Sequence, residues 1–234
     1  MNIDIYEPWP DKIEILSFNH KYLSINEPVE MYWYVKHYDV KSVAFCDDSS
    51  TKSLEMFLTI CDDLKLKPIY GVKFKVKTIE DTALDIVETI CYAKNSKGID
   101  ALKMLCSFVS DGVLRAEDLW KNCDDLLIGI DFSFDHSVID TVENLLEYFL
   151  VPDFVFVGAT VFFSAFWDEV FEKLIDMSVL ICAKENSCKN ENLYSNMIQP
   201  MIEHFWFLED YIDRAVVYNP RIFLSKIEPY DEQS

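Results

Sequence analysis

The sequence is short of glycine, of histidine and of basic residues, and each shortage excludes a class of function. Its 234 residues include only five glycines and four histidines; there is no glycine-rich phosphate-binding loop and no histidine pair at metal-ligand spacing. Lysine and arginine number 21 against 41 aspartates and glutamates, which gives a formal net charge of −20. Because this charge repels nucleic acid phosphates and anionic membranes, we expect no direct binding to either.

Paired cysteines and long apolar runs are missing as well. The seven cysteines form no CxxC pair, and most lie inside apolar strand or helix patterns, which is typical of buried, reduced thiols. The first residues, MNIDIYEPWPDK, are acidic and have no apolar signal core. The longest apolar stretch, residues 149–167, is interrupted by Pro152, Asp153 and Gly158. We therefore expect a cytoplasmic protein that does not span a membrane.

Apolar residues make up half of the sequence, and they are arranged as strands alternating with helices. Residues 40–73 show this pattern most clearly. An apolar run is followed by Leu54, Phe57, Leu58 and Cys61 at helical spacing, and then by the strand-like KPIYGVKFKV. A helix between two strands predicts parallel neighbours joined by a crossover.

The rest of the chain repeats this alternation. Further strands are predicted at 12–19, 84–93, 126–132, 153–160 and 178–184, and helices at 28–39, after AKNSKG, and at 116–122, 136–149 and 164–176. The helix after AKNSKG has Ile99, Leu102, Leu105 and Phe108 on one face. Seven strand–helix units fit a barrel better than an open sheet. With no linker in sight, we predict one domain over residues 1–234, with a helical tail at about 192–234.

Four segments resemble, in order, the PHP (polymerase and histidinol phosphatase) domain of bacterial C-family replicative DNA polymerases. LKPIYGVKF is similar to the family's GIKPIxGxE strand, and CYAKNSKGIDALKMLCSFVS to its H…LLAKNxxGxxNLxKLVS strand and helix. LWKNCDDLLIGIDFS resembles the L…GLIxxSAC segment, and residues 207–229 resemble the segment that closes this domain in the Gram-positive type of the polymerase.

The resemblance implies an α/β fold, a distorted seven-unit (β/α) barrel of the PHP type with extra C-terminal helices. In the intact family the strand ends hold up to three metals, and the enzymes hydrolyse phosphoesters. Carried over position by position, the family's ligands are replaced almost throughout. For example, the HxH motif falls on Ser17 and Asn19, and the glutamate of GxE falls on Lys73. The degenerate metal positions are Ser17, Asn19, Asn26, Asp48, Lys73, Glu88, Phe132, Glu185 and Ser187.

These residue types do not suit a metal, which needs imidazole, thiolate or carboxylate donors converging from several strands. Asp48, Glu88 and Glu185 could still donate oxygen atoms, but no family histidine remains. Lys73 would put an ammonium where a dication should bind, so we expect it to neutralise the remaining carboxylates as a buried or half-buried ion pair. No metal, no other cofactor and no catalytic residue is therefore expected.

Three interpretations of the function follow. The first is a catalytically inactive PHP-like protein-binding module linked to DNA replication, whose origin in a phage or other mobile element is a further hypothesis. The second is a phosphoesterase with a rebuilt site that uses Asp47, Asp48, Glu88 and Glu185, with His20 as a further candidate. The third is an acidic inhibitor or decoy that imitates DNA or a host polymerase domain.

The charge and one aromatic cluster suggest how a partner would bind. An acidic surface favours a protein partner with a basic face, such as a replication or nucleic-acid-handling protein. The cluster MYWYVKHY (residues 31–38) has Trp33 and Tyr34 on opposite sides of the expected helix. Core packing is the simpler interpretation of this cluster. The alternative is an exposed contact patch formed by Trp33, Tyr34 and Tyr38.

Overall fold

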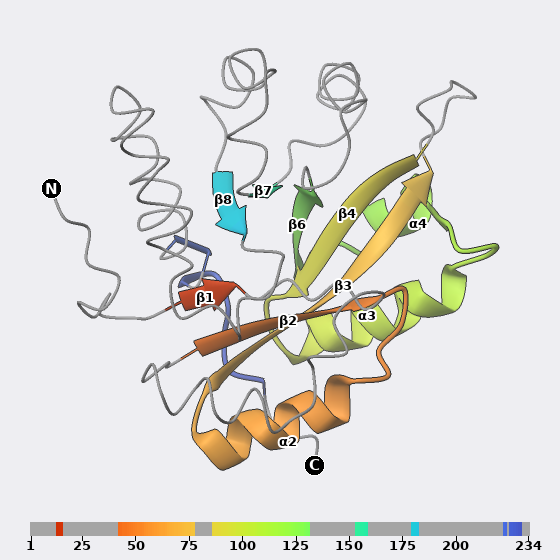
Figure 1. Ribbon diagram of the computed structural model, residues 1–234. Coiled ribbons are helices and arrows are strands. Elements are labelled where there is room, and N and C mark those ends of the chain that lie inside the picture. Colours follow the sequence, from red (N-terminus) through yellow and green to blue (C-terminus); the bar gives the residue numbers. More distant parts are fainter. Residues whose placement is uncertain are drawn as a thin grey trace, which may run out of the picture.

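The computed structural model describes residues 13–15, 42–77, 86–131, 153–158, 179–182, 222–223 and 225–230, and these build a twisted sheet with helices on one side (Figure 1). The strands are β1 (Ile13–Ile15), β2 (Ser42–Asp48), β3 (Lys67–Lys77), β4 (Ile86–Ala93), β5 (Leu114–Arg115), β6 (Leu126–Asp131), β7 (Phe154–Gly158) and β8 (Val179–Cys182). The helices are α2 (Leu54–Leu64), α3 (Ser96–Phe108) and α4 (Ala116–Trp120).

The strands follow the order β1-β2-β3-β4-β6-β7-β8, and β5 pairs with β3 beside this path. The pairs β1–β2, β2–β3, β6–β7 and β7–β8 are parallel, whereas β4 runs antiparallel to both β3 and β6. The crossover from β2 through α2 to a parallel β3 confirms the prediction for residues 40–73.

The predicted closed seven-unit (β/α) barrel is wrong, because the described strands form an open, mixed sheet. Within the described residues, no pairing joins β8 to β1. The reversal at β4 has a simple cause. Only residues 78–85 connect β3 to β4, and a parallel return needs a crossover of about a dozen residues or more. A short connection can only fold the chain back on itself.

The helices cover one face of this sheet. Helix α2 buries Leu54, Phe57, Ile60 and Cys61. It ends at Lys65, whose left-handed φ of 57° lets the amides of Lys65 and Leu66 bond back to the last turn. Helix α3 buries Gly98, Ile99, Leu102 and Leu105. Phe108, predicted on the same face of α3, instead remains 42% exposed.

The opposite face carries a core cluster that is partly filled from the far end of the sequence. Strand residues and two residues from the 222–230 region pack together here: Ala44, Cys46, Ile69, Ile90, Tyr92, Leu127, Phe223 and Ile227. The rings of Tyr92 and Phe223 meet edge to face, with centroids 5.3 Å apart. We call residues 222, 223 and 225–230 the strap, because they lie across this face from β2 to β6.

Several predicted elements lie outside the described residues, namely the helices at 28–39, 136–149 and 164–176 and most of the helical tail at 192–234. Strand β5 has no counterpart in the sequence predictions, since two residues are too few to give a periodic signal. In the part of the chain that the structure describes, every helix falls short of the length and apolarity needed to cross a membrane.

Candidate functional site

Strand register brings three of the predicted site positions to one end of the strap-covered face. Asp48 is the register partner of Lys73 in the parallel β2–β3 pair. In the antiparallel β3–β4 pair, Glu88 is opposite Lys75, two residues along from Lys73. Neighbouring strand residues in register project to the same side. The sheet therefore gathers Asp48, Lys73 and Glu88 on one surface.

Lys73 and Glu88 form an ion pair at this end of the face. The Lys73 side chain is 11% exposed and that of Glu88 is 37% exposed, so the pair is half buried and the ammonium is its more deeply buried member. The expectation that Lys73 neutralises a remaining carboxylate is thus confirmed for Glu88. Asp48 is exposed, and it accepts a hydrogen bond of 3.1 Å from the Ser49 hydroxyl.

The side chains at this position do not fit a metal ion. Lys73 offers no lone pair when protonated, and it occupies the carboxylate that Glu88 would otherwise present to a cation. Among the described residues, no group of three or more His, Cys, Asp or Glu side chains has the arrangement of a metal site. The described positions therefore do not supply the donors that the metal chemistry implied by the family resemblance needs.

Asp47, included in the rebuilt-site interpretation, has a structural role instead. It is 1% exposed and holds the start of α2. Its Oδ2 accepts a 2.9 Å bond from the Ser53 amide, and its Oδ1 accepts a 2.9 Å bond from the Ser53 hydroxyl. The Tyr70 hydroxyl donates a third bond of 2.5 Å to Oδ2. A carboxylate at a helix N-terminus also suits the helix dipole, so every oxygen of Asp47 is already engaged.

Tyr70 connects this carboxylate to the aromatic core under α2. Its ring stacks with that of Phe45 at a centroid distance of 6.2 Å and is tilted by 40° to that of Phe57 at 5.9 Å. Burial, followed by the hydrogen bond to the Asp47 carboxylate, raises the pKa of Tyr70 far above its ordinary value. The phenol is therefore a neutral, fixed donor rather than an acid–base group. Sequence reasoning missed this role, because Asp47, Ser53 and Tyr70 meet only through folding.

The motif AKNSKG also turns out to have a structural role. Asn95 caps α3 by accepting a 3.1 Å bond from the Gly98 amide, and its side-chain amide donates to Asp125 at 2.9 Å. A Cβ on Gly98 would come within 2.4 Å of the Asp125 carbonyl oxygen. The Asn and Gly of this motif are thus explained by a helix cap and a close backbone approach.

The remaining predicted positions lie outside the described residues, so the structure does not place them relative to Lys73. They are the family metal positions Ser17, Asn19, Asn26, Phe132, Glu185 and Ser187, the candidate His20, and the contact-patch residues Trp33, Tyr34 and Tyr38.

In comparisons with known proteins, no protein-family model matches this chain and no curated protein matches it. The resemblance of its segments to the PHP domain stays a hypothesis.

Proposed function

We propose that this chain is a protein-binding module without catalytic activity that works with the DNA replication machinery. The observation that carries the proposal is the Lys73–Glu88 ion pair. It puts a nearly buried ammonium where a phosphoesterase of the resembled family needs a metal ligand, and without a metal there is neither an activated water nor a Lewis acid for a phosphoryl oxygen. The link to replication rests on the similarity of LKPIYGVKF, CYAKNSKGIDALKMLCSFVS and LWKNCDDLLIGIDFS to the PHP domain.

The partner we propose is a protein with a basic face. The formal charge of −20 speeds the approach of a cationic surface and repels bare DNA. Among the described residues, exposed acids lie on separate elements, including Glu55 and Asp63 on α2, Glu117 on α4 and Asp124 just before β6. Five of the described cysteines, namely Cys46, Cys61, Cys91, Cys106 and Cys123, are free thiols, which supports a reducing cytoplasm as the place of action.

The rebuilt phosphoesterase is the less favoured alternative. Of the carboxylates that it would use, Asp47 already accepts three hydrogen bonds and Glu88 is paired with Lys73. Releasing either would leave buried groups without partners. The binding experiment also tests the acidic decoy. A decoy differs from the first proposal only in that it takes the place of DNA or of a host polymerase domain on the partner.

Two measurements test the proposal. Hydrolysis of bis-p-nitrophenyl phosphate in the presence of Mn²⁺ or Zn²⁺ should be indistinguishable from buffer. Turnover that is lost in both Asp48→Ala and Glu88→Gln would contradict the proposal, whereas a contaminating activity would survive both substitutions.

For binding, a partner recovered by crosslinking in the native cell is titrated across a salt series with the wild type and two double variants. Glu55→Lys/Asp63→Lys and Glu117→Lys/Asp124→Lys change the net charge equally but at different places. Affinity should fall with salt, and the two variants should weaken it unequally if one face makes the contact. Salt-independent affinity, or tight binding to bare DNA, would overturn the proposal, and displacement of the partner's own DNA would favour the decoy.

A further inference from the structure

The strap bonds to the sheet at the point where the β3–β4 ladder ends. Their last register pair is Gly71 with Tyr92, and the next pair in this register would be Tyr70 with Ala93. The Tyr230 hydroxyl takes the place of that pair. It accepts a 2.9 Å bond from the Tyr70 amide and donates a 3.0 Å bond to the Ala93 carbonyl. One phenol thus satisfies two backbone groups that the ladder leaves open.

The backbone of the strap is held by the same two strands. The Lys67 ammonium, at the start of β3, donates a 2.8 Å bond to the Ile227 carbonyl. The Glu228 amide donates a 2.7 Å bond to the Lys94 carbonyl, just past the end of β4. Each contact joins segments more than 130 residues apart in the sequence, so all of them form or break together with the docking of the strap.

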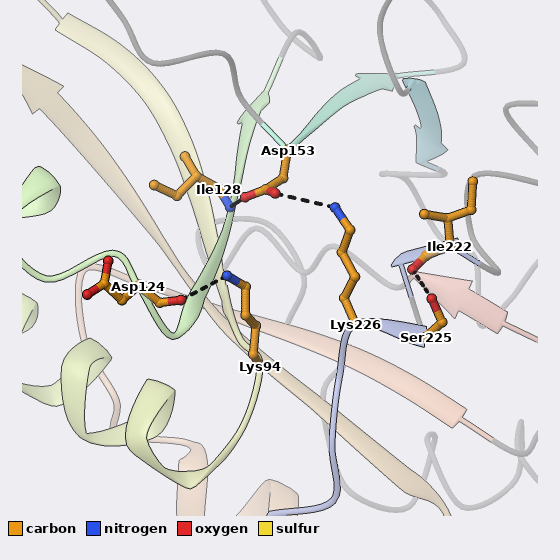
Figure 2. Close-up of polar contacts among 7 residues, drawn as sticks. All are labelled: Lys94, Asp124, Ile128, Asp153, Ile222, Ser225 and Lys226. Carbon is orange, nitrogen blue, oxygen red and sulfur yellow. Dashed lines mark hydrogen bonds and ion pairs between the residues drawn. The ribbon is translucent and has the colours of Figure 1, made fainter.

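A third anchor lies at Lys226, the strap residue just before Ile227 (Figure 2). The Lys226 ammonium is 3.4 Å from the Asp153 carboxylate, whose second oxygen accepts a 3.1 Å bond from the Ile128 amide of β6. The side chains of Lys226 and Asp153 are 40% and 33% exposed, so water screens both members of this ion pair and we expect it to contribute little. The docking of the strap therefore depends on the Tyr230 hydroxyl, on the backbone bonds at Ile227 and Glu228, and on the apolar contacts of Phe223 and Ile227.

Two buried cysteines lie on opposite faces of the sheet, one on the face of the strap and one on the face of the helices. Cys46, 1% exposed, belongs to the cluster that contains Phe223 and Ile227. Cys91, 0% exposed, projects to the opposite face, because it lies between Ile90 and Tyr92 of that cluster on β4. In the described part of the chain, Cys46 therefore shares its cluster with the strap, whereas Cys91 lies on the face that the helices cover.

We propose that the strap is a latch, by which we mean a segment that undocks from the sheet as a unit while the helix-covered face stays folded. The Tyr230 hydroxyl holds this latch closed. The described contacts that hold it come from one short segment, they reach residues remote in sequence, and two of the hydrogen bonds converge on the Tyr230 hydroxyl. A segment docked in this way can open as one cooperative unit. The open state presents an apolar sheet face that the closed state hides. This latch does not depend on the function proposed above.

The two buried thiols test the latch in the full-length protein. Labelling with iodoacetamide under native conditions, followed by peptide mass spectrometry, gives separate rates for Cys46 and Cys91. In the wild type, Cys46 should react at least about tenfold faster than Cys91, because latch opening needs less free energy than global unfolding. In Tyr230→Phe, two buried backbone groups lose their partner, so the Cys46 rate should rise by about 10- to 100-fold with little change at Cys91.

Two further variants complete the experiment. Ser225→Ala removes only a local bond within the strap, from the Ser225 hydroxyl to the Ile222 carbonyl at 2.7 Å, and should leave both rates unchanged. Ile227→Val trims the strap's packing gently and should raise the Cys46 rate alone, so the test survives even if Tyr230→Phe folds poorly. The proposal is overturned if Cys46 and Cys91 react at equal rates in every variant, or if Tyr230→Phe fails to accelerate Cys46.

Discussion

Reversing the charge of Lys73 is the perturbation that bears most directly on the site. Lys73→Glu puts a carboxylate beside Glu88 and beside the register position of Asp48. Removing one partner of a fully buried ion pair costs about 3–5 kcal/mol. Because the Glu88 side chain keeps 37% of its exposure, water screens part of this loss. We expect the free energy of unfolding to fall by about 2–4 kcal/mol, and the Tm by about 5–12 °C.

Urea and thermal unfolding at pH 7 measure this loss, and two variants interpret it. Lys65→Glu makes the same substitution at a side chain that is 80% exposed and paired with Asp62, so it should cost less than about 1 kcal/mol. The double variant Lys73→Glu/Glu88→Lys restores opposite charges and should recover at least about half of the loss. The deficit of Lys73→Glu should also shrink as the pH falls toward about 4, since protonation removes the repulsion. An unchanged midpoint in Lys73→Glu would refute the reasoning.

Four further predictions concern the core and the site. Asp47→Ala should lower the free energy of unfolding by about 3 kcal/mol, because the buried donors that bond to the Asp47 carboxylate lose their acceptor. Asp48→Ala, at the exposed neighbour, should change the free energy of unfolding by less than about 0.5 kcal/mol. Equal effects of the two substitutions in urea unfolding would contradict the structural role of Asp47. Gly98→Ala should destabilise by about 1–3 kcal/mol despite the better helix propensity of alanine, because the new Cβ meets a backbone oxygen at 2.4 Å; a gain in Tm would show that the approach is looser. The pKa of Tyr70 is raised in the folded state above its ordinary value of 10.0, so its stabilisation is complete below that pH and is lost as the pH climbs above it; stability measured from pH 9 to 11 should fall less steeply in Tyr70→Phe, and parallel curves would argue against the shift. Protein purified without chelator should carry far less than one equivalent of zinc or manganese by elemental mass spectrometry, and a stoichiometric content would reverse the assignment of the site.

Local pattern was sufficient wherever the signal is carried by neighbouring residues. The apolar spacing of α2 and the strand character of KPIYGVKFKV follow from residues that are close in sequence, and both elements lie where they were predicted. The pairing of Lys73 with a carboxylate was expected from the resemblance to the PHP domain, which assigns Lys73 and Glu88 to one site, and not from local pattern. Local pattern failed at Phe108, since the helical period alone does not say how far the sheet extends beneath the end of α3.

The direction of β4 and the closure of the sheet were decided by the fold as a whole. Strand periodicity is the same for parallel and antiparallel neighbours, so the count of strand–helix units pointed to a barrel that the described sheet does not form. Only the shortness of the connection at residues 78–85 indicated that β4 runs antiparallel to β3. Asp47 and Tyr230 show the same limit at single residues. Their partners lie between 6 and 160 residues away in the sequence, and hydrogen bonds over such separations depend on register and packing, to which no local pattern is sensitive.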